Sequence, residues 1–315
     1  MPNQHSKPTG QQKRYQQNDA HGASSKFGQM IGEAFDTQVF ALIQKHLQEA
    51  HPDHILLTPA EGKKMVKLEM FGGTSRQMDN IIVLEGSNEP VALFESKWLK
   101  DGRHHNDKGA WILQLREVSK NYPTVRGAVA CLAGYWTEGV AVMFEQEGRI
   151  QMVHVATDEE VYGTLQPHVD EFCKRHALPV LQLDAREIRN SLPRSWDLAN
   201  CLIELADNDQ LRDLAESWLR FARRTTDDGQ PQLGSDLIRE AIDKLLDPLP
   251  EVPSVEKFEI TLQIDTGNII YAEFADFEEA TAFIQMYHRN PQAILDKIKP
   301  KKSPPPEQSA PDSSD

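Results

Sequence analysis

The sequence predicts an α/β (α+β) fold, with a central mixed sheet in the main core, then a helical segment and a small ββα unit. Residues 26–49 carry apolar side chains at helical spacing. Ile81–Leu84 and Val91–Phe94 are apolar runs on either side of a turn-forming sequence, which predicts a hairpin. A second amphipathic segment, 105–122, then precedes the apolar run Gly127–Ala133, which is expected to be a buried strand.

The predicted hairpin brings three charged side chains together. Pairing with residue numbers that sum to about 175 puts Asp79 opposite Ser96, beside Glu95 and Lys97. The second strand begins apolar on both faces, as a central strand does, and becomes polar only at its C-terminal end. Two adjacent carboxylates repel each other unless a cation lies between them. We therefore expect a hydrolytic metal site; the alternative is a set of solvated charges at a strand end.

These residues resemble the PD-(D/E)xK nuclease superfamily, the restriction-endonuclease-like folds that include Mrr-type and Holliday-junction-resolvase-type enzymes. The motif is an Asp, a strand, and then Glu-x-Lys at a strand end, matched here by Asp79, Glu95 and Lys97. The residues just before Asp79 are similar to the Gln-x-Asp form of Mrr-like members, with Gln77 as the glutamine. The resemblance covers about residues 27–135 and implies a restriction-endonuclease-like αβββαβ core.

A helix acid extends the resemblance. The family often carries Gly-x-x-Phe-Glu on the helix before the hairpin, and Gly32–Asp36 matches it with Asp in place of Glu. Asp36 lies in an otherwise apolar row of its helix, where an unpaired carboxylate would cost several kcal/mol. A metal, a metal-bound water or Lys97 would compensate this cost. The alternatives are that Asp36 borders solvent, or that Glu33 is the helix acid of the site.

The helix after Lys97 supplies a further candidate. Its expected core-facing stripe consists of Trp111, Leu115, Val118 and Tyr122. Gln114 flanks this stripe. Some family members use a Gln or Tyr on this helix near the scissile phosphate, so the resemblance implies that role for Gln114; the alternative is a surface polar residue.

The resemblance implies a metal-dependent endonuclease that hydrolyses DNA phosphodiester bonds, of restriction, defence or repair type. Asp79 and Glu95, with the carbonyl of Ser96, would hold Mg²⁺ through hard oxygen ligands, with Mn²⁺ as a substitute. Lys97 would orient or deprotonate the attacking water. Asp36 would contribute to a second metal.

Charge limits where DNA can bind. The chain has 315 residues, a formal net charge of −14 and a pI of about 5.3, which argues against DNA contact over the whole surface. The charge is uneven, since residues 97–126 hold seven basic and three acidic residues. This basic segment adjoins the predicted site and is expected to meet the phosphate backbone, unless it is only a solvated helix face. The candidate nucleic-acid-binding residues are Lys100, Arg103, Lys108, Arg116 and Lys120.

Composition divides the chain into segments. The predicted division is a disordered tail at 1–25, the nuclease-like core at 26–185, a helical segment at 186–247, a linker at 248–256, the ββα unit at 257–298 and a disordered tail at 299–315. Within the core, further strands are expected at Val140–Phe144, Ile150–Val155 and Pro179–Leu183, with a helix at Glu159–Arg175.

The ββα unit is acidic, with seven acids against one lysine over residues 256–287. Such a surface repels DNA, so we expect it to contact a protein partner or a second copy of the chain. Without a long apolar run or a signal peptide, the sequence predicts a cytoplasmic protein that does not enter membranes. The three cysteines are far apart and imply no zinc or disulfide framework.

Two further interpretations stay open. A non-catalytic interaction or regulatory protein on the same fold is favoured by the acidic charge of the chain and of its C-terminal unit. The complete set of Asp79, Glu95 and Lys97 favours the enzyme instead. The third interpretation is an unrelated α+β protein with chance matches to the motif.

Overall fold

The structure is a computed structural model and forms two compact units, Met1–Asp247 and Pro248–Asp315. It describes residues 20–57, 66–71, 73–87, 89–102, 105–148, 150–184, 194–248, 255–263 and 269–290. Parts of the predicted tails and linker, residues 1–19, 249–254 and 299–315, lie outside the described residues.

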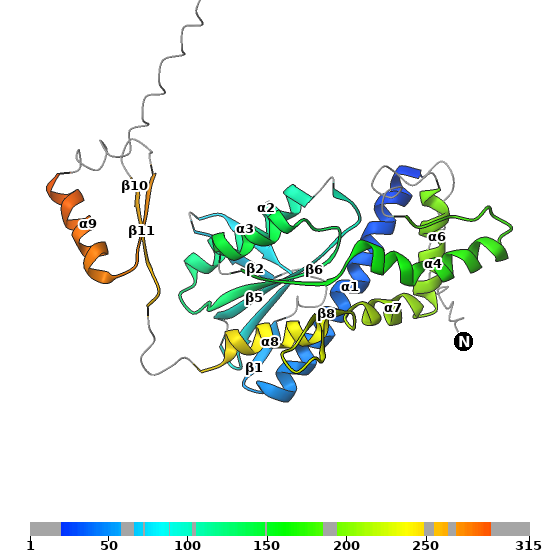
Figure 1. Cartoon of the computed structure of the whole chain (residues 1–315), viewed down its shortest axis with the longest axis horizontal. Coiled ribbons are helices and arrows are strands. Elements are labelled where there is room, and N and C mark those ends of the chain that lie inside the picture. Colours follow the sequence, from blue (N-terminus) through cyan, green and yellow to red (C-terminus); the bar gives the residue numbers. More distant parts are fainter. Residues whose placement is uncertain are drawn as a thin grey trace, which may run out of the picture. The chain divides into compact units, whose positions relative to one another are not determined.

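A central sheet organises the first unit (Figure 1). Among the described residues it has five strands, in the order β1-β4-β5-β6-β7. β1, β4 and β5 pair antiparallel, whereas β5–β6 and β6–β7 are parallel, so the predicted mixed sheet is confirmed. The strands are β1 His54–Leu57, β4 Asn80–Leu84, β5 Pro90–Leu99, β6 Gly127–Gly134 and β7 Ile150–Ala156.

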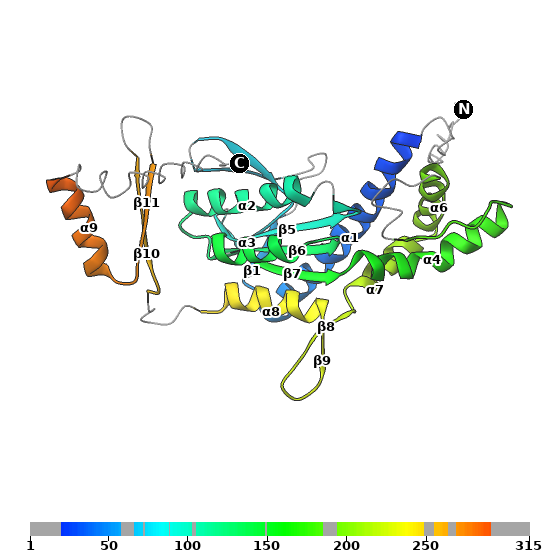
Figure 2. The same cartoon turned by 45° about the horizontal axis from the view of Figure 1, so that its top comes forward.

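Helices cover both faces of this sheet (Figures 1 and 2). α2 and α3 lie over one face, in an apolar cluster that includes Leu93 of β5. α1 and α8 cover the other face, in a cluster that includes Phe94 of β5 and extends beyond the sheet to α4, α6 and α7. The helices are α1 Ala20–Ala50, α2 His105–Asn121, α3 Glu138–Gly148, α4 Asp158–Arg175, α6 Ser195–Asp207, α7 Gln210–Trp218 and α8 Gly234–Leu246. Of the helices in the described residues, none has the length and apolar character that crossing a membrane requires.

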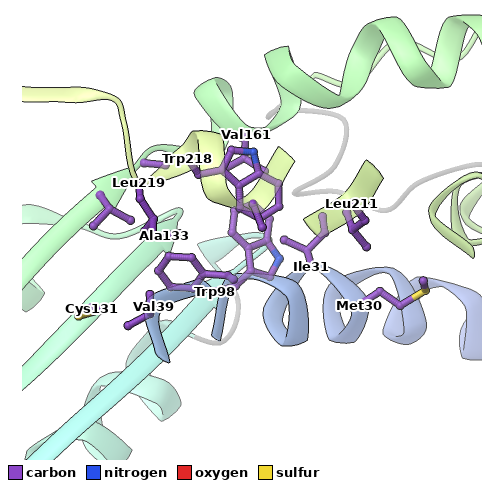
Figure 3. Close-up of a cluster of buried hydrophobic side chains, with 14 of the residues drawn as sticks. Met30, Ile31, Val39, Trp98, Cys131, Ala133, Val161, Leu211, Trp218 and Leu219 are labelled. Atoms are coloured by element: carbon purple, nitrogen blue, oxygen red, sulfur yellow. The ribbon is translucent and has the colours of Figure 1, made fainter. Parts of the chain in front are cut away.

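Two tryptophans fix the C-terminal end of β5 in the larger cluster (Figure 3). Trp98 of β5 meets the ring of Tyr162 edge-on, with 5.9 Å between the centroids. Trp218 of α7 is fully buried and donates a 2.9 Å hydrogen bond from Nε1 to Thr164 Oγ1. Aromatic contacts of this kind add to the free energy gained by burial, so the contact of Trp98 with Tyr162 stabilises the position of the end of β5.

A short hairpin stands outside the central sheet. It pairs β2 (Val66–Glu69) with β3 (Ser75–Met78), and the chain turns at Asp79 before entering β4. Without this hairpin, the order of elements from the N-terminus is α1-β1-β4-β5-α2-β6.

The N-terminal helix is longer than predicted. It begins at Ala20, so residues 20–25, expected in a disordered tail, are helical. Ala23 is fully buried, as is Phe27 one turn later. Burial of these two side chains stabilises the additional helical turn.

The predicted strand at Val140–Phe144 is wrong, because this segment lies within helix α3. Val140 and Phe144 are buried, while Val142 is 43% exposed. In a strand these three side chains would share one face, whereas a helix brings only residues four apart together. A short apolar run does not distinguish the two.

The predicted strand at Pro179–Leu183 is also wrong, although Leu181 and Leu183 are buried. Gln166 of α4 takes the place of a neighbouring strand. Its Nε2 donates to the Leu181 carbonyl at 2.9 Å, and its Oε1 accepts from the Leu183 amide at 2.6 Å. The predicted helix at 159–175 and strand at 150–155 are confirmed as α4 and β7.

A hairpin interrupts the segment predicted as helical. β8 (Ala222–Thr225) pairs with β9 (Pro231–Leu233) between α7 and α8. Gly229 in its turn has φ of +82°, a backbone conformation that glycine adopts without steric cost. The sequence analysis missed this turn because it weighed only the apolar periodicity on either side.

The second unit has the predicted ββα order. β10 (Phe258–Gln263) pairs antiparallel with β11 (Ile269–Phe274), and α9 (Phe277–Arg289) follows. Asp276 caps α9 by accepting a 2.8 Å hydrogen bond from the Glu279 amide. Tyr271 and Phe277 are about two thirds exposed, at 68% and 67%.

Candidate functional site

Three charged side chains meet near the C-terminal end of β5. Lys97 Nζ lies 2.5 Å from Asp79 Oδ2 and 2.7 Å from Glu95 Oε2. Glu95 and Lys97 are two residues apart on β5 and therefore share a face. Asp79 reaches them from the corner between β3 and β4. The two carboxylates thus face each other across a single ammonium group.

The hairpin register differs from the predicted one by one residue. Asn80 pairs with Phe94, and Ile82 with Ala92, so paired numbers sum to 174. The register shifts again between Ile82 and Val83, next to the turn. Asp79, just before the ladder, therefore comes level with Glu95 rather than with Ser96. The convergence with Lys97 is unaffected because the side chain of lysine is long.

Burial differs sharply within this group. The side chain of Glu95 is 1% exposed, whereas those of Asp79 and Lys97 are 21% and 20% exposed. Burial raises the pKa of Glu95, Lys97 opposes this, and Asp79 adds to it. Burial lowers the pKa of Lys97, but Glu95 and Asp79 outweigh it and the net direction is upward. Lys97 is therefore a charged ammonium here, suited to orienting water and offsetting negative charge rather than to accepting a proton.

Arg76 of β3 is a member of this group that the sequence analysis missed. Its Nη2 lies 2.6 Å from Glu95 Oε1, and its Nη1 donates to the Trp111 carbonyl at 2.5 Å. The guanidinium also lies 4.9 Å from the centroid of the Trp111 ring. Both Arg76 and Glu95 are 1% exposed. Arg76 thus holds one oxygen of Glu95 and leaves Oε2 directed at Lys97 and Asp79.

The phase of helix α2 explains why Trp111 contacts Arg76. Trp111, predicted to face the core, is 42% exposed, whereas the neighbouring Ile112 is fully buried with Leu115 and Val118. The predicted stripe is therefore wrong at its first position. Gln114 is half-buried, and no hydrogen bond or ion pair in the described part of the chain joins it to Asp79, Glu95 or Lys97.

Asp36 of α1 approaches β5 from the opposite side. Ser96 Oγ donates a hydrogen bond to Asp36 Oδ1, and Ser96 points away from the face that carries Glu95 and Lys97. Within the described residues, the carboxylate oxygens of Asp36, Asp79 and Glu95 do not all come within 4.8 Å of one another. Glu33, the alternative helix acid, is exposed and accepts a hydrogen bond from Gln29.

The charge of Asp36 makes stability depend on pH. Burial raises its pKa above 3.8, the Ser96 hydrogen bond opposes this, and Asp79 adds to it. A raised folded-state pKa contributes stability that is complete below the unfolded pKa and is lost as pH rises through the folded pKa. In metal-free urea unfolding, wild type should therefore lose stability relative to Asp36→Asn as pH rises from below 4 toward neutrality. A difference that is constant with pH would contradict the burial of this charge.

The predicted basic residues do not form one exposed set. Lys108 and Lys120 of α2 are exposed, and Lys120 pairs with Glu117 at 2.9 Å. Lys100 and Arg116 are half-buried, and Arg103 lies outside the described residues. Arg126, counted in the basic segment, donates from Nη1 to the carbonyls of Leu246 and Asp247 at the end of α8. A surface for phosphate would therefore depend mainly on exposed residues of α2.

The donors at the end of β5 fit a hard divalent cation. Asp79 Oδ2 and Glu95 Oε2 already face one positive centre, and carboxylate oxygens are the ligands that Mg²⁺ prefers. Asp79 and Lys97 are both partly exposed, so the group is open to solvent. This arrangement can hold a cation beside a water molecule and a fixed ammonium.

Comparison of the chain with models of protein families, with curated proteins and with solved structures finds no match. A proposal of function therefore depends on the geometry around β5. The mixed α/β architecture alone does not choose among functions, because one fold supports many chemistries.

Proposed function

We propose that this protein is a metal-dependent endonuclease that hydrolyses DNA phosphodiester bonds, with a PD-(D/E)xK-type core. The observation that carries the proposal is the single ammonium of Lys97 between the carboxylates of Asp79 and Glu95. The order α1-β1-β4-β5-α2-β6 supports it, since this is the αβββαβ order of that superfamily. Restriction, defence and repair roles are all compatible with this chemistry.

Asp79 and Glu95 would hold Mg²⁺ or Mn²⁺, each through the oxygen that now faces Lys97. When bound, the metal would supply Lewis acidity that lowers the pKa of water and stabilises charge on the phosphate. Arg76 keeps Glu95 Oε2 directed at the site by holding Oε1. Asp36 lies on the α1 side of the strand and would not bind the same metal as Asp79 and Glu95. It would act through its hydrogen bond with Ser96, or by binding a second metal.

Lys97 would orient the attacking water and stabilise negative charge that develops on the phosphate. Without a bound metal, Glu95 and Asp79 raise its pKa and hold it as an ammonium beside the two carboxylates. Lys108 and Lys120 are exposed on α2 and would contact the DNA backbone. Gln114 would contact the phosphate, although none of the described residues of the site is its hydrogen-bond partner.

Cleavage of supercoiled plasmid and of branched DNA by the full chain, with Mg²⁺, Mn²⁺ or EDTA, tests the proposal. We expect metal-dependent cutting by wild type and none by Asp79→Asn, because the neutral amide is a much weaker metal ligand. Calorimetric titration with Mn²⁺ should show a parallel loss of binding. Asp213→Asn is the matched control, since Asp213 is 73% exposed on α7 and only weakly paired with Arg212 at 3.7 Å.

A non-catalytic interaction protein on the same fold is the second candidate. The observation that favours it is the double pairing of Glu95 with Arg76 and Lys97, which compensates its buried charge without a metal. Absence of cutting on every substrate, together with absence of Mn²⁺ binding by wild type, would favour this candidate. The acidic ββα unit would then be the surface to test for a protein partner or a second copy.

A further inference from the structure

A cluster of histidines joins the end of α1 and the start of β1 to α8, away from the carboxylates at β5. His46 Nε2 lies 2.7 Å from Asp243 Oδ1, and His51 Nε2 lies 2.8 Å from the same oxygen. The three ligand atoms all lie within 4.8 Å of one another. His46 follows Asp36 on α1 by ten residues, a rise of about 15 Å along the helix, so this is a separate site.

From this geometry we infer that His46, His51 and Asp243 form a binding site for a divalent transition metal, with Zn²⁺ as the best match. Two imidazole nitrogens and one carboxylate oxygen are a common zinc ligand set. Metal–ligand bonds of about 2.0–2.2 Å put the ligand atoms of a tetrahedral site roughly 3.3 Å apart. The distances of 2.7 and 2.8 Å therefore need to open by only about half an ångström.

The cluster is closed on the histidine side and open at Asp243. The side chain of Asp243 is 41% exposed, while those of His46 and His51 are 11% and 14% exposed, so the site faces solvent through Asp243.

His54 supplies an independent observation beside the cluster. Its ring lies edge-on to that of His51, with 6.0 Å between the centroids. Its Nδ1 bonds to Asp53 Oδ1 at 2.8 Å, while its Nε2 is buried and has no hydrogen-bond partner among the described residues. A buried nitrogen without a partner is costly in a protein interior. It lies beside the three proposed ligands, outside the group of atoms that lie within 4.8 Å of one another.

Zinc binding here would tie three elements of the first unit together. His46 lies in the last turns of α1, His51 in the turn that follows, and Asp243 in α8. A metal that binds the folded state but not the unfolded chain raises stability by RT ln(1 + [M]/Kd), where [M] is the free metal concentration. We therefore expect Zn²⁺ to raise the melting temperature of the full chain, independently of any nuclease activity.

The test uses tag-free full-length protein, stripped with EDTA and dialysed against Zn²⁺ or Co²⁺. We expect about one retained metal per chain by mass spectrometry, visible d–d bands of Co²⁺ in a nitrogen- and oxygen-ligated site, and an upward shift of the melting temperature. Asp243→Asn keeps an oxygen that accepts both imidazole N–H groups but removes the charge. It should lower zinc affinity by about 100-fold or more, at or above the effect of losing a group that only hydrogen-bonds to a metal ligand.

Two controls separate this site from others. His288→Ala removes an exposed histidine of α9, and Asp79→Asn alters the carboxylates at β5; both should retain the metal. Absence of a retained metal in wild type, or equal retention by wild type and Asp243→Asn, would overturn the inference and leave a hydrogen-bonded cluster. If Asp243→Asn does not fold, the Co²⁺ spectrum of Asp79→Asn decides: intense d–d bands that persist in this variant place the metal at the histidines, and their absence overturns the inference.

Discussion

Lys97→Met is expected to lower the rate of DNA cleavage by about 10²- to 10³-fold, the range typical of losing one group that stabilises developing negative charge. Lys97 is the only described residue whose ammonium contacts both Asp79 and Glu95, at 2.5 and 2.7 Å. Methionine keeps most of the apolar side chain and removes the charge, so the packing around β5 should survive. Initial rates of plasmid cleavage at saturating Mg²⁺ measure the effect.

The same substitution should leave the affinity for metal unchanged or increase it. In the structure the ammonium of Lys97 occupies the space between two carboxylates, and a divalent cation must compete with it for Asp79 and Glu95. Calorimetric titration with Mn²⁺ checks this. Loss of cleavage with retained metal binding would separate Lys97 from Asp79, whose amide variant should lose both.

The control for Lys97 is Lys174→Met, which changes an exposed lysine of α4. Its cleavage rate and metal affinity should match those of wild type. A Lys97→Met protein that is folded but cleaves at the wild-type rate would contradict the proposed role. Parallel loss of metal affinity and rate would instead indicate a collapsed site, with Asp79 and Glu95 no longer held in place.

The part of the site that the sequence predicted is the part determined by short-range geometry. Glu95 and Lys97 share a face because side chains alternate along a strand, and this holds whatever surrounds β5. Asp79 follows from the hairpin, where an error of one residue in register still leaves it within reach of Lys97. The mixed sheet follows similarly, since the hairpin is antiparallel and a helical connection such as α2 permits parallel pairing of β5 with β6.

The parts that the sequence did not predict depend on contacts between distant segments. Arg76 contacts Glu95 because the β2–β3 hairpin brings it to β5. The spacing of residues along the chain does not predict this contact. A signal was present, however, since Arg76 shares its strand face with Met78, which is fully buried. A buried cation needs an acid, and Glu95 was available. The phase error at Trp111 has the same origin, because the aromatic ring packs against Arg76 instead of the core.

The sequence also did not predict on which side of β5 Asp36 lies. The apolar periodicity of α1 placed Asp36 in a row that packs against the core, and its side chain is half-buried, but the periodicity did not indicate which face of β5 it meets. The observed partner is Ser96, so Asp36 is separated from Glu95 by the strand itself. Sequence spacing gives neighbours along a helix, whereas the position of the helix on the sheet is set by the packing of whole side chains.

Arg76→Met is expected to lower the free energy of unfolding by at least about 3 kcal/mol, the lower end for breaking a buried ion pair. Arg76 and Glu95 are both 1% exposed, and burial already raises the pKa of Glu95. Without the guanidinium, Glu95 keeps only Lys97 as a cation, and the Trp111 carbonyl loses its donor. Urea unfolding at neutral pH measures the loss. Arg212→Met is the matched control, because Arg212 is 60% exposed and lies 3.7 Å from its acid partners; it should cost about 1 kcal/mol or less.

The double variant Arg76→Met/Glu95→Leu separates the two contributions of this pair. Replacing both members of a buried ion pair by apolar residues is often neutral or stabilising, so most of the lost stability should return. Cleavage should not return, because Glu95 is a proposed metal ligand. Recovery of stability without activity would mean that Arg76 and Glu95 are paired to orient Oε2 toward Asp79 rather than to stabilise the fold. A single Arg76→Met variant as stable as Arg212→Met would contradict this, since it would mean that Glu95 becomes neutral or finds water at little cost.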